Sequence, residues 1–376
     1  MKIQEMPRLA AFGFRSFPPK DGSAGEDKFA FELYPRLAKK GLSVHVFTRT
    51  NQWTESGKKA HLENIHILPL WTVNRSGFDT LFHSMNCTLR IILGDIADVV
   101  HIHNGGNSIW AFLLRIAGKR VYITQDGVDW KRDKWPWYAR LYLRLSSLVT
   151  AYIPNDVIFD NVYVKKTFQE KYNRKFQMIG YGSSVDRSYK NSTILESLSL
   201  VSLDYFLFIG RFIPDKGIHY LIEAYRNIKT DKKLVIVGGS PNDKAFEDRL
   251  KKLAEGDSRI MFPGFVYGED VNKLINETYL YIQPSDVEGL SPVILQVMGL
   301  ATPLLCSDIE ENIYITESDA LHFERSNIND LGKQLTYAIN NPKVIRNNAK
   351  KGQQRILVAY DWDKITSQYL EVFSSP

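Results

Sequence analysis

Short apolar runs alternate with amphipathic stretches along almost the whole chain, and this alternation limits the fold more than any other feature. In the first half, the runs expected to form strands are RLAAFGF (8–14), SVHVFT (43–48), NIHILPL (64–70), DVVHIH (98–103), RVYITQ (120–125), VTAYIP (149–154) and FQMIG (176–180). The second half repeats the scheme with YFLFIG (205–210), KLVIVGG (233–239), RIMFPG (259–264), YLYIQPS (279–285), PLLCS (303–307) and ALHF (320–323). Strands separated by helices predict two doubly wound α/β domains, each with a parallel sheet covered on both faces.

The chain has 376 residues, enough to form two hydrophobic cores. We expect Rossmann-like domains over 1–185 and 204–358, joined by the polar segment 186–203, and a last helix within 359–376. No apolar run approaches the length of a membrane span, and the first residues are too few and too polar for a signal peptide. Cys87 and Cys306 fit no disulfide or zinc spacing, so we expect free thiols in a cytoplasmic protein.

Charge is distributed unevenly between the two halves. Residues 1–185 contain 26 lysines and arginines against 16 aspartates and glutamates, a net charge of +10, whereas residues 186–376 carry 22 against 26, a net charge of −4. The asymmetry predicts that the first half meets an anionic partner, which could be a membrane surface, an acidic lipid-linked substrate or nucleic acid. The alternative is a scatter of charges with no partner.

Ligands of doubly wound folds bind at the carboxyl ends of the strands, so the loops there are the candidate sites. The first of them, SFPPKDGSAGEDKF (16–29), has glycines such as Gly25 that allow close approach of the backbone to a ligand, although a turn with a helix cap at Asp27 explains it equally. It has no G-x-G-x-x-G, and the chain has no Walker A sequence. A second loop, NGGN (104–107), follows His101 and His103, which share a strand face. A metal pair is conceivable there, but the lack of a third ligand favours a histidine beside a pocket.

The stretch TQDGVDWKRDKWPWYARLYLRLSSL (124–148) is the most unusual of the chain. It mixes aromatic and cationic side chains, and those we assign to an acceptor or membrane contact are Trp130, Lys131, Arg132, Lys134, Trp135 and Trp137. Helical spacing places Trp137, Leu141, Leu145 and Leu148 on one stripe, with Arg140 and Arg144 off it. Such a stripe indicates either an interfacial membrane helix or an ordinary core-facing helix.

Two loops of the second half carry the strongest signals. GRFIPDKG (210–217) follows an apolar strand and precedes a helix, so that Arg211 and Lys216 could form a clamp for a diphosphate. PSDVEGLSPVILQVM (284–298) places Glu288 just before a helix that Pro292 can start. Helix amides would keep this carboxylate ionised, and it could accept hydrogen bonds from sugar hydroxyls, although capping is the alternative role.

These residues resemble those of the family 4 retaining glycosyltransferases of GT-B fold. The similarity covers nearly the whole chain and is most specific from 205 to 310, in GRFIPDKGIHYLIEAY, KKLVIVGGS, RIMFPGFVYGEDV and YLYIQPSDVEGLSPVILQVMGLATPLLCSDIEEN. It includes AGEDKFAFELYPRLAKKGLSVHVFTR (24–49), the terminal YDWDKITSQYLEVF, and DGVDWKRDKW (126–135), which is similar to a segment of bacterial polysaccharide glycosyltransferases. The resemblance implies two domains facing across a cleft, with a last helix that returns to the first domain.

The resemblance also implies an activity and a set of site residues. Such enzymes move a sugar from a nucleoside diphosphate donor to an acceptor, retain the anomeric configuration and use no metal. Arg211 and Lys216 match the donor pyrophosphate clamp, Glu288 the first glutamate of an E-x7-E motif, Gly25 the amino-terminal glycine loop and Val266 the backbone site that reads the base. The implied donor site also includes Gly289, Leu290, Ser291 and Gln296, and the implied catalytic groups are Asp126, Glu288, Arg211 and Lys216.

The chain departs from the family pattern at three places. Gln296 replaces the second glutamate, Asp126 stands where the family usually has histidine, and Ser291-Pro292 replaces a glycine-containing turn. An anion at Asp126 would repel a diphosphate unless it were protonated or paired. The alternative prediction is therefore a catalytically silent GT-B protein that binds a nucleotide or a partner protein.

Together with the residues at the strand ends, the resemblance implies a retaining glycosyltransferase of bacterial surface-polysaccharide assembly. Its donor would be a UDP- or GDP-linked sugar, its acceptor a lipid-linked saccharide, and neither a metal nor another cofactor would be required. We expect it in the cytoplasm, at the inner face of the membrane, where the basic first domain meets anionic lipid. A nucleic-acid partner is not expected, because the chain has no known recognition helix or RNA-binding aromatic motif.

Overall fold

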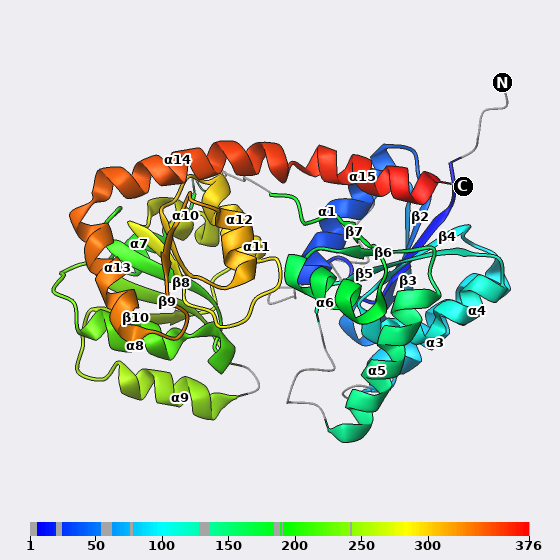
Figure 1. Ribbon diagram of the computed structural model, residues 1–376, viewed down its shortest axis with the longest axis horizontal. Helices are drawn as coiled ribbons and strands as arrows, with labels where there is room; N and C mark the ends of the chain where they lie inside the picture. Colours follow the sequence, from blue (N-terminus) through cyan, green and yellow to red (C-terminus); the bar gives the residue numbers. More distant parts are fainter. Residues whose placement is uncertain are drawn as a thin grey trace. The chain divides into compact units, whose positions relative to one another are not determined.

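The computed structural model describes residues 6–19, 25–53, 62–75, 78–127, 136–183, 189, 191–240 and 243–375. The chain forms two compact units, shown in Figure 1. The first unit consists of Met1–Tyr181 together with Trp362–Pro376, and the second of Gly182–Asp361. The last segment of the chain therefore belongs to the first unit.

The first unit is built on a parallel sheet of seven strands in the order β3-β2-β1-β4-β5-β6-β7. Its strands are β1 (Leu9–Phe12), β2 (Val44–Arg49), β3 (Ile65–Leu70), β4 (Val99–His103), β5 (Arg120–Gln125), β6 (Asp156–Phe159) and β7 (Gln177–Met178). Its helices are α1 (Gly25–Lys39), α3 (Phe78–Gly94), α4 (Ala111–Ile116), α5 (Trp137–Tyr152), α6 (Val162–Tyr172) and α15 (Trp362–Ser374), with short 3₁₀ turns η1 (Thr50–Gln52) and η2 (Gly105–Trp110). The strand order reverses between β1 and β4.

Helices cover both faces of this sheet. On one face, Phe12, Ile102 and Ile123 pack with residues of α3, α4, α5 and α6 in a single buried cluster. On the other face lie α1 and α15, which run side by side in Figure 1 and contribute the buried Tyr34 and Tyr369. Burial on both faces accounts for the apolar character of these strands.

The second unit has a parallel sheet of six strands in the order β10-β9-β8-β11-β12-β13. Its strands are β8 (Tyr205–Arg211), β9 (Lys233–Gly239), β10 (Ile260–Gly264), β11 (Leu280–Gln283), β12 (Leu304–Ser307) and β13 (Leu321–Phe323). Its helices are α7 (Ile194–Ser197), α8 (Ile218–Arg226), α9 (Lys244–Leu253), α10 (Glu269–Glu277), α11 (Pro292–Gly299), α12 (Glu310–Thr316), α13 (Ile328–Asn340) and α14 (Pro342–Ala359), with the 3₁₀ turn η4 (Pro214–Lys216). Here the strand order reverses between β8 and β11.

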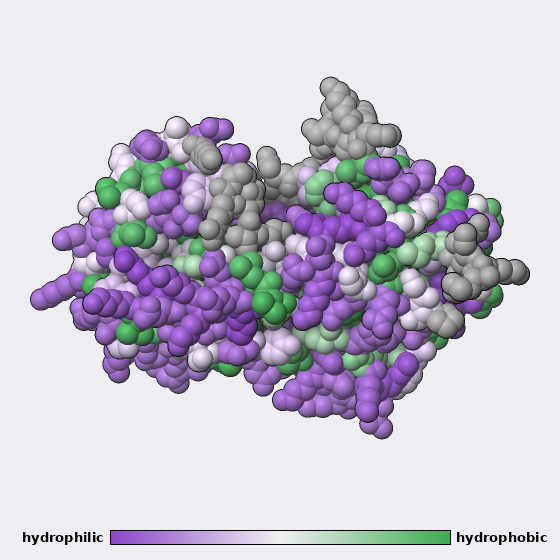
Figure 2. Space-filling model, turned by 90° about the horizontal axis from the view of Figure 1, so that it is seen from above, coloured by the Kyte–Doolittle hydropathy of each residue, from purple (hydrophilic) through white to green (hydrophobic). Residues whose placement is uncertain are grey.

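One face of the second sheet carries a core that joins α8, α9 and α13 to β8, β9 and β11. On another side of the unit, α11 packs against the long helix α14. Helix α14 faces the viewer in Figure 2, where the surface is mostly hydrophilic and the apolar residues form small separate groups.

The prediction of two doubly wound parallel sheets is confirmed, and most of the expected strands form within a residue or two. One strand assignment is wrong, because VTAYIP (149–154) begins as the last turn of α5 and the strand follows at β6. In that helix the small residues Ser146, Ser147 and Thr150 are buried, and they continue a helical stripe into the apolar run. The sequence pattern of a short apolar segment does not distinguish a buried helix end from a strand.

Candidate active site

The loops after β8 and β11 meet where the strand order of the second sheet reverses, which is the place where doubly wound folds bind ligands. Gly217, directly after η4, makes this approach possible. Its φ is +65°, and a Cβ atom there would lie 1.9 Å from the carbonyl oxygen of Pro284. The two loops are also joined by the amide of Asp286, which donates a 2.9 Å hydrogen bond to the carbonyl oxygen of Asp215.

Lys216 and Glu288 form an ion pair at this junction. The ammonium nitrogen of Lys216 lies 2.5 Å from Oε1 of Glu288, and the two side chains are 18% and 6% exposed. The same oxygen accepts hydrogen bonds from Nε2 of Gln283 at 2.5 Å and from Oγ of Ser285 at 2.6 Å. Three donors converge on one carboxylate oxygen, so the side chain of Glu288 is held in one orientation.

A second layer of hydrogen bonds holds these donors in place. The hydroxyl of Tyr281 lies 3.0 Å from Oε1 of Gln283 and 3.1 Å from the carbonyl oxygen of Ile209, and its one hydrogen can be donated to either. Ser307, at the end of β12, donates to the carbonyl oxygen of Ser285, and Asn312 donates to Ser307. Side chains from the ends of β8, β11 and β12 thus fix the orientation of the Lys216–Glu288 pair.

The helix that follows Glu288 begins as the sequence predicts. Ser291 is the N-cap of α11 and accepts a hydrogen bond from the amide of Ile294, and Pro292 occupies the first turn. Gly289 is half-buried and Leu290 is buried between the glutamate and the cap. The positive end of the α11 dipole and Glu288 therefore lie within a few residues of each other.

The other donor-site residues predicted in this unit occupy separate positions around the sheet. Arg211 is the last residue of β8 and is exposed, and its side chain forms no hydrogen bond or ion pair with other residues that the structure describes. Val266 is half-buried just after β10. Gln296 lies on α11, and its Nε2 donates to Oδ1 of Asn272 on α10. The structure thus brings Lys216 and Glu288 into contact, while Gln296 makes its hydrogen bond to a neighbouring helix.

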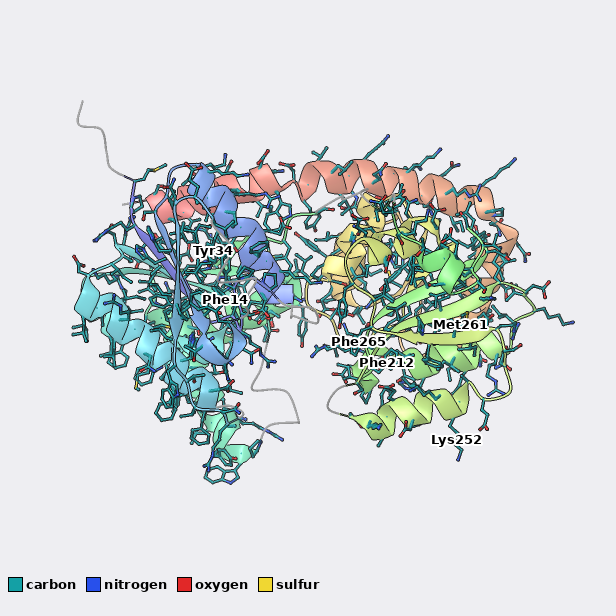
Figure 3. All side chains as sticks on the ribbon, turned by 180° about the vertical axis from the view of Figure 1, so that it is seen from behind. Phe14, Tyr34, Phe212, Lys252, Met261 and Phe265 are labelled. Atoms are coloured by element: carbon teal, nitrogen blue, oxygen red, sulfur yellow. The ribbon has the colours of Figure 1, made fainter. Side chains whose placement is uncertain are left out.

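Two aromatic rings border the same edge of this sheet, as Figure 3 shows for Phe212 and Phe265. A Cβ atom on Gly239 would lie 2.8 Å from the ring of Phe265, and one on Gly238 would lie 3.2 Å from that of Phe212. Phe265 is 47% exposed and is parallel to the ring of Tyr267, with centroids 6.0 Å apart. These rings form an apolar border at the carboxyl ends of β9 and β10.

The first unit has its own reversal of strand order, between β1 and β4. Gly25 begins α1 there, and Glu26 and Asp27 follow in its first turn. Oδ1 of Asp27 accepts hydrogen bonds from the amides of Arg15 and Ser16, at 2.8 and 3.3 Å, which fastens the described part of the β1 loop to α1. The loop predicted to approach a ligand thus ends at a point where folds of this kind bind one.

Asp126 lies directly after β5, and Asp160 lies beside it, directly after β6. The two strands are in register at Gln125 and Phe159, so these aspartates are the next pair along the sheet edge. Asp160 is buried, and within the described part of the chain its Oδ1 has no hydrogen-bond partner. Burial, with a smaller contribution from the charge of Asp126, raises the pKa of Asp160 to about 8, and hydrogen bonding to Tyr181 partly opposes this shift.

His101 and His103 are both fully buried, and the hydroxyl of Tyr34 lies between their rings. Burial lowers the pKa of His103 to about 3 and that of His101 well below its usual value, so both imidazoles are neutral. No group of three or more His, Cys, Asp and Glu side chains in the described part of the chain is arranged to hold a metal ion. The structure favours the interpretation of these histidines as buried groups beside a site.

The apolar stripe of α5 lies on the surface. Trp137 is 77% exposed, and Leu141, Leu145 and Leu148 are about half exposed, so the core-facing interpretation is wrong. Neighbouring helices add further exposed apolar side chains, which are Leu89 and Leu93 of α3 and Phe112 and Ile116 of α4. Trp130, Lys131, Arg132, Lys134 and Trp135 lie outside the described residues. None of the helices described here is both long and apolar enough to span a membrane.

Comparisons with known proteins place the second unit in a family. Residues 196–355 match the family model "Glycosyl transferases group 1", and residues 95–184 match "Domain of unknown function (DUF1972)". The uncharacterized glycosyltransferase MJ1607 of Methanocaldococcus jannaschii is 29% identical over 174 residues, which are 44% of each chain. The capsular polysaccharide biosynthesis glycosyltransferase CapM of Staphylococcus aureus is 20% identical over 358 residues, 89% of this chain and 91% of CapM.

Solved structures share the fold over nearly the whole chain. Sucrose-phosphate synthase from Thermosynechococcus elongatus superposes with a TM-score of 0.82 at 18% identity, covering 97% of this chain and 98% of that one. HepE of Anabaena, in complex with UDP and glucose, gives 0.80 at 15% identity and covers 98% and 100%. The second unit therefore contains a domain similar to the group 1 glycosyl transferases, and the whole chain has the GT-B fold. This confirms the predicted fold class.

Several residues of the candidate site were not found from the sequence. Gln283 and Ser285 support Glu288, Asp160 pairs with Asp126, and Glu26 faces His103. A signal was available for the first three, because each is a polar residue at the end of an apolar strand or within two residues after it. Glu26 gives no such signal, since a glutamate in the first turn of a helix is ordinary.

Proposed function

We propose that this protein is a glycosyltransferase that takes its sugar from a nucleoside diphosphate donor bound at the reversal of strand order in the second sheet. The observation that carries the proposal is the ion pair of Lys216 and Glu288, held there by Gln283 and Ser285. A lysine ammonium is suited to a diphosphate, and a fixed carboxylate is suited to the hydroxyls of a sugar. The complex of HepE with UDP and glucose, a protein of the same fold, is consistent with this assignment.

The diphosphate would be neutralised without a metal ion. Lys216 reaches the site from η4, the start of α11 adds the positive end of a helix dipole, and the exposed guanidinium of Arg211 can turn toward a bound phosphate. When a diphosphate enters, it competes with Glu288 for the ammonium group, and this leaves the carboxylate to the sugar hydroxyls. The amide groups near Gly289 and Leu290 supply further donors, and the assignment of Gly25 to the donor site stays a prediction from the sequence.

We assign the base and ribose contacts to Val266 and Gln296. Val266 follows β10, where its backbone can read the base, as in the resembling family. Gln296 takes the place of a glutamate, and its amide can both donate to and accept from a ribose hydroxyl once it leaves Asn272. The phenyl ring of Phe265 offers an apolar face at the same strand ends.

The transfer step would proceed with retention of configuration. The bond between the anomeric carbon and the diphosphate oxygen breaks, and a bond to the acceptor hydroxyl oxygen forms on the same face. The acceptor proton passes to an oxygen of the departing diphosphate, so no protein nucleophile is needed. We assign Asp126 of the first unit a catalytic role, and a proton held by the Asp126–Asp160 pair would limit the negative charge there.

The acceptor we propose is a lipid-linked saccharide of a bacterial surface polysaccharide. The exposed stripe of α5 and the net charge of +10 over residues 1–185 fit an anionic membrane surface at which the protein is peripherally bound. Trp130, Lys131, Arg132, Lys134 and Trp135 precede Trp137 and would extend this contact. The relation to CapM, a capsular polysaccharide biosynthesis glycosyltransferase, supports this class of acceptor.

A panel of UDP- and GDP-linked sugars tests the proposal, with binding measured by calorimetry and turnover by release of the nucleotide. The assay contains a lipid-diphosphate saccharide acceptor in vesicles and is repeated with EDTA. The expected result is binding of one donor and its turnover in the presence of EDTA. Saturable binding with no turnover for any donor and acceptor would support the alternative of a silent nucleotide-binding protein, and the absence of binding would refute the donor site.

A further inference from the structure

A chain of buried polar groups runs through the first unit from α15 to α1. The hydroxyl of Tyr369 lies 3.5 Å from Oγ1 of Thr124, which lies 2.6 Å from Nε2 of His101. Nδ1 of His101 is 2.8 Å from the hydroxyl of Tyr34, which in turn is 2.5 Å from Nε2 of His103. The remaining nitrogen, Nδ1 of His103, faces Oε1 of Glu26 at 3.6 Å. Figure 3 labels Tyr34, the middle member, on the side of the sheet that α1 covers.

The hydrogen bonds along this series of buried polar groups can all run in one of two directions. Each neutral imidazole has one N–H and one bare nitrogen, and each hydroxyl has one hydrogen. If His103 donates from Nε2, its bare Nδ1 faces the Glu26 carboxylate, and two acceptors oppose each other. If His103 instead carries its hydrogen on Nδ1, then Tyr34 donates to His103, His101 donates to Tyr34, and Thr124 donates to His101. Only this second direction places an N–H toward Glu26.

Glu26 occupies a position where a ligand can be bound. It lies in the first turn of α1, whose dipole favours an ionised carboxylate, at the reversal of strand order between β1 and β4. Its side chain is 17% exposed, whereas the rest of the polar chain is buried. Nδ1 of His103 is fully buried and has no hydrogen-bond partner among the residues that the structure describes, because 3.6 Å exceeds the reach of a hydrogen bond.

The spacing of these two atoms suits a hydroxyl group. An oxygen placed about 2.8 Å from each of them would accept a hydrogen bond from Nδ1–H and donate one to the carboxylate. A phosphate is excluded at this point, since it would face the carboxylate with a like charge. The pair therefore selects a neutral, hydroxyl-bearing ligand rather than the diphosphate of the donor.

We propose that Glu26 binds a hydroxyl group of the saccharide acceptor and that His103 positions this carboxylate through its Nδ1–H. The identification of the ligand as the acceptor rests on the proposed function. Tyr34 and His101 act through His103, and they are positioning residues that fix its tautomer. In the acceptor site of the first unit, the Glu26 carboxylate would thus face an N–H of His103. Tyr34 and His101, which do not contact the ligand, determine that this nitrogen carries the hydrogen.

The tautomer provides a test that needs no substrate. In protein labelled with ¹⁵N at its 8 histidines, long-range ¹H–¹⁵N spectra distinguish Nδ1–H from Nε2–H, and His101→Gln and His103→Gln assign the two signals. The expected result is Nδ1–H for both residues, with no titration between pH 5 and 8. An Nε2–H signal for His103 would overturn the proposed direction and with it the positioning of Glu26.

Acceptor binding provides the second test. The probes are octyl β-D-glucoside and octyl N-acetyl-β-D-glucosaminide below their micelle concentrations, followed by saturation-transfer NMR and, where transfer occurs, by acceptor KM. Glu26→Gln is expected to weaken acceptor binding at least about tenfold, and Glu26→Asp less, because a charged acceptor of the hydrogen bond is lost. Tyr34→Phe is expected to raise the acceptor KM severalfold and to shift the His103 tautomer equilibrium, with the donor KM unchanged.

Glu32→Gln is the matched control, since Glu32 is on the same helix and, among the residues that the structure describes, pairs with Arg36 one turn further along. It should leave acceptor binding and the donor KM as in the wild type. If Glu26→Gln binds both glycosides like the wild type, the inference is wrong even where the enzyme transfers sugar. If the wild type binds glycosides and loses them on Glu26→Gln but binds no nucleotide sugar, the proposed donor function fails while the saccharide site stands.

Discussion

The ammonium nitrogen of Lys216 lies 2.5 Å from Oε1 of Glu288, and this contact joins the loop after β8 to the loop after β11. Both charges are largely removed from water, so each depends on the other for compensation. The pair also receives donors from Gln283 and Ser285, which leaves little freedom for either side chain to turn away. A ligand that binds here must therefore replace the contact between Lys216 and Glu288 with its own contacts to these two charged groups.

Replacement of Lys216 by alanine is expected to abolish transfer and to lower the stability of the second unit. Glu288 would remain as a buried carboxylate without its cation, at a cost of about 2–3 kcal/mol. Donor binding, measured by calorimetry, should weaken at least about a hundredfold because a direct phosphate contact is lost.

Lys251→Ala is the control for this variant. Lys251 pairs with Glu247 at 2.7 Å in the same unit, but it is 51% exposed, and loss of such a surface pair should cost less than about 1 kcal/mol. Unchanged turnover and donor affinity of Lys216→Ala would remove the diphosphate assignment, whatever its melting temperature.

Gly217→Ala is expected to separate the two loops of the site. A Cβ atom at this position would lie 1.9 Å from the carbonyl oxygen of Pro284, and the φ of +65° is strained for alanine. We expect a loss of at least about 3 kcal/mol in urea unfolding, together with loss of donor binding.

Gly256→Ala separates backbone strain from this collision. Gly256 has a φ of +82°, but no atom lies within 4 Å of its Cβ position, so alanine should cost only about 1–2 kcal/mol and leave the site intact. Equal effects of the two substitutions would show that the close approach of the loops contributes nothing to the site.

The sequence predicts the sheets well because each strand is apolar on both faces and is followed by turn residues. It also predicts Lys216 and Glu288 as a pair of loop residues, since both follow strands that parallel topology brings to one edge. It does not predict that the two form an ion pair. That contact depends on η4 and on the close approach at Gly217, which a strand pattern does not contain.

Other parts of the site follow from distances across the fold that no local pattern encodes. Glu26 and His103 are 77 positions apart, and their partnership arises because β1 and β4 are neighbours at the reversal of strand order. The apolar stripe of α5 is a different case. Its helical spacing is clear in the sequence, but the sequence does not show whether the stripe faces the core or the solvent. Only the structure shows that Trp137 and Leu141 are exposed.

Leu145→Glu on α5 is expected to weaken binding to vesicles of anionic lipid. Leu145 is 50% exposed in the middle of the apolar stripe, so the substitution removes buried contact with lipid and adds repulsion without disturbing the core. Cosedimentation with phosphatidylglycerol vesicles should fall at least about threefold. Val358→Glu, at a position of the second unit that is 70% exposed, should bind like the wild type. Equal loss in both variants would point to net charge rather than to α5.

Asp160 makes the stability of the first unit depend on pH. Its pKa is about 8 in the folded protein, against 3.8 for an unperturbed aspartate, because it is buried and faces Asp126. Between about pH 4 and pH 8 the folded form holds a proton that the unfolded chain has lost. Stability therefore falls as the pH rises through this range, by up to about 1.4 kcal/mol per pH unit, and changes no further above it.

Asp160→Asn removes this titration while keeping a group that can hydrogen-bond to Tyr181. The melting temperature of the variant minus that of the wild type should increase as the pH rises from 5 to 8. Calorimetry at each pH measures this difference. Asp156→Asn, on the same strand, controls for the loss of a carboxylate. A constant difference between Asp160→Asn and the wild type over this range would mean that Asp160 is ionised in the folded protein.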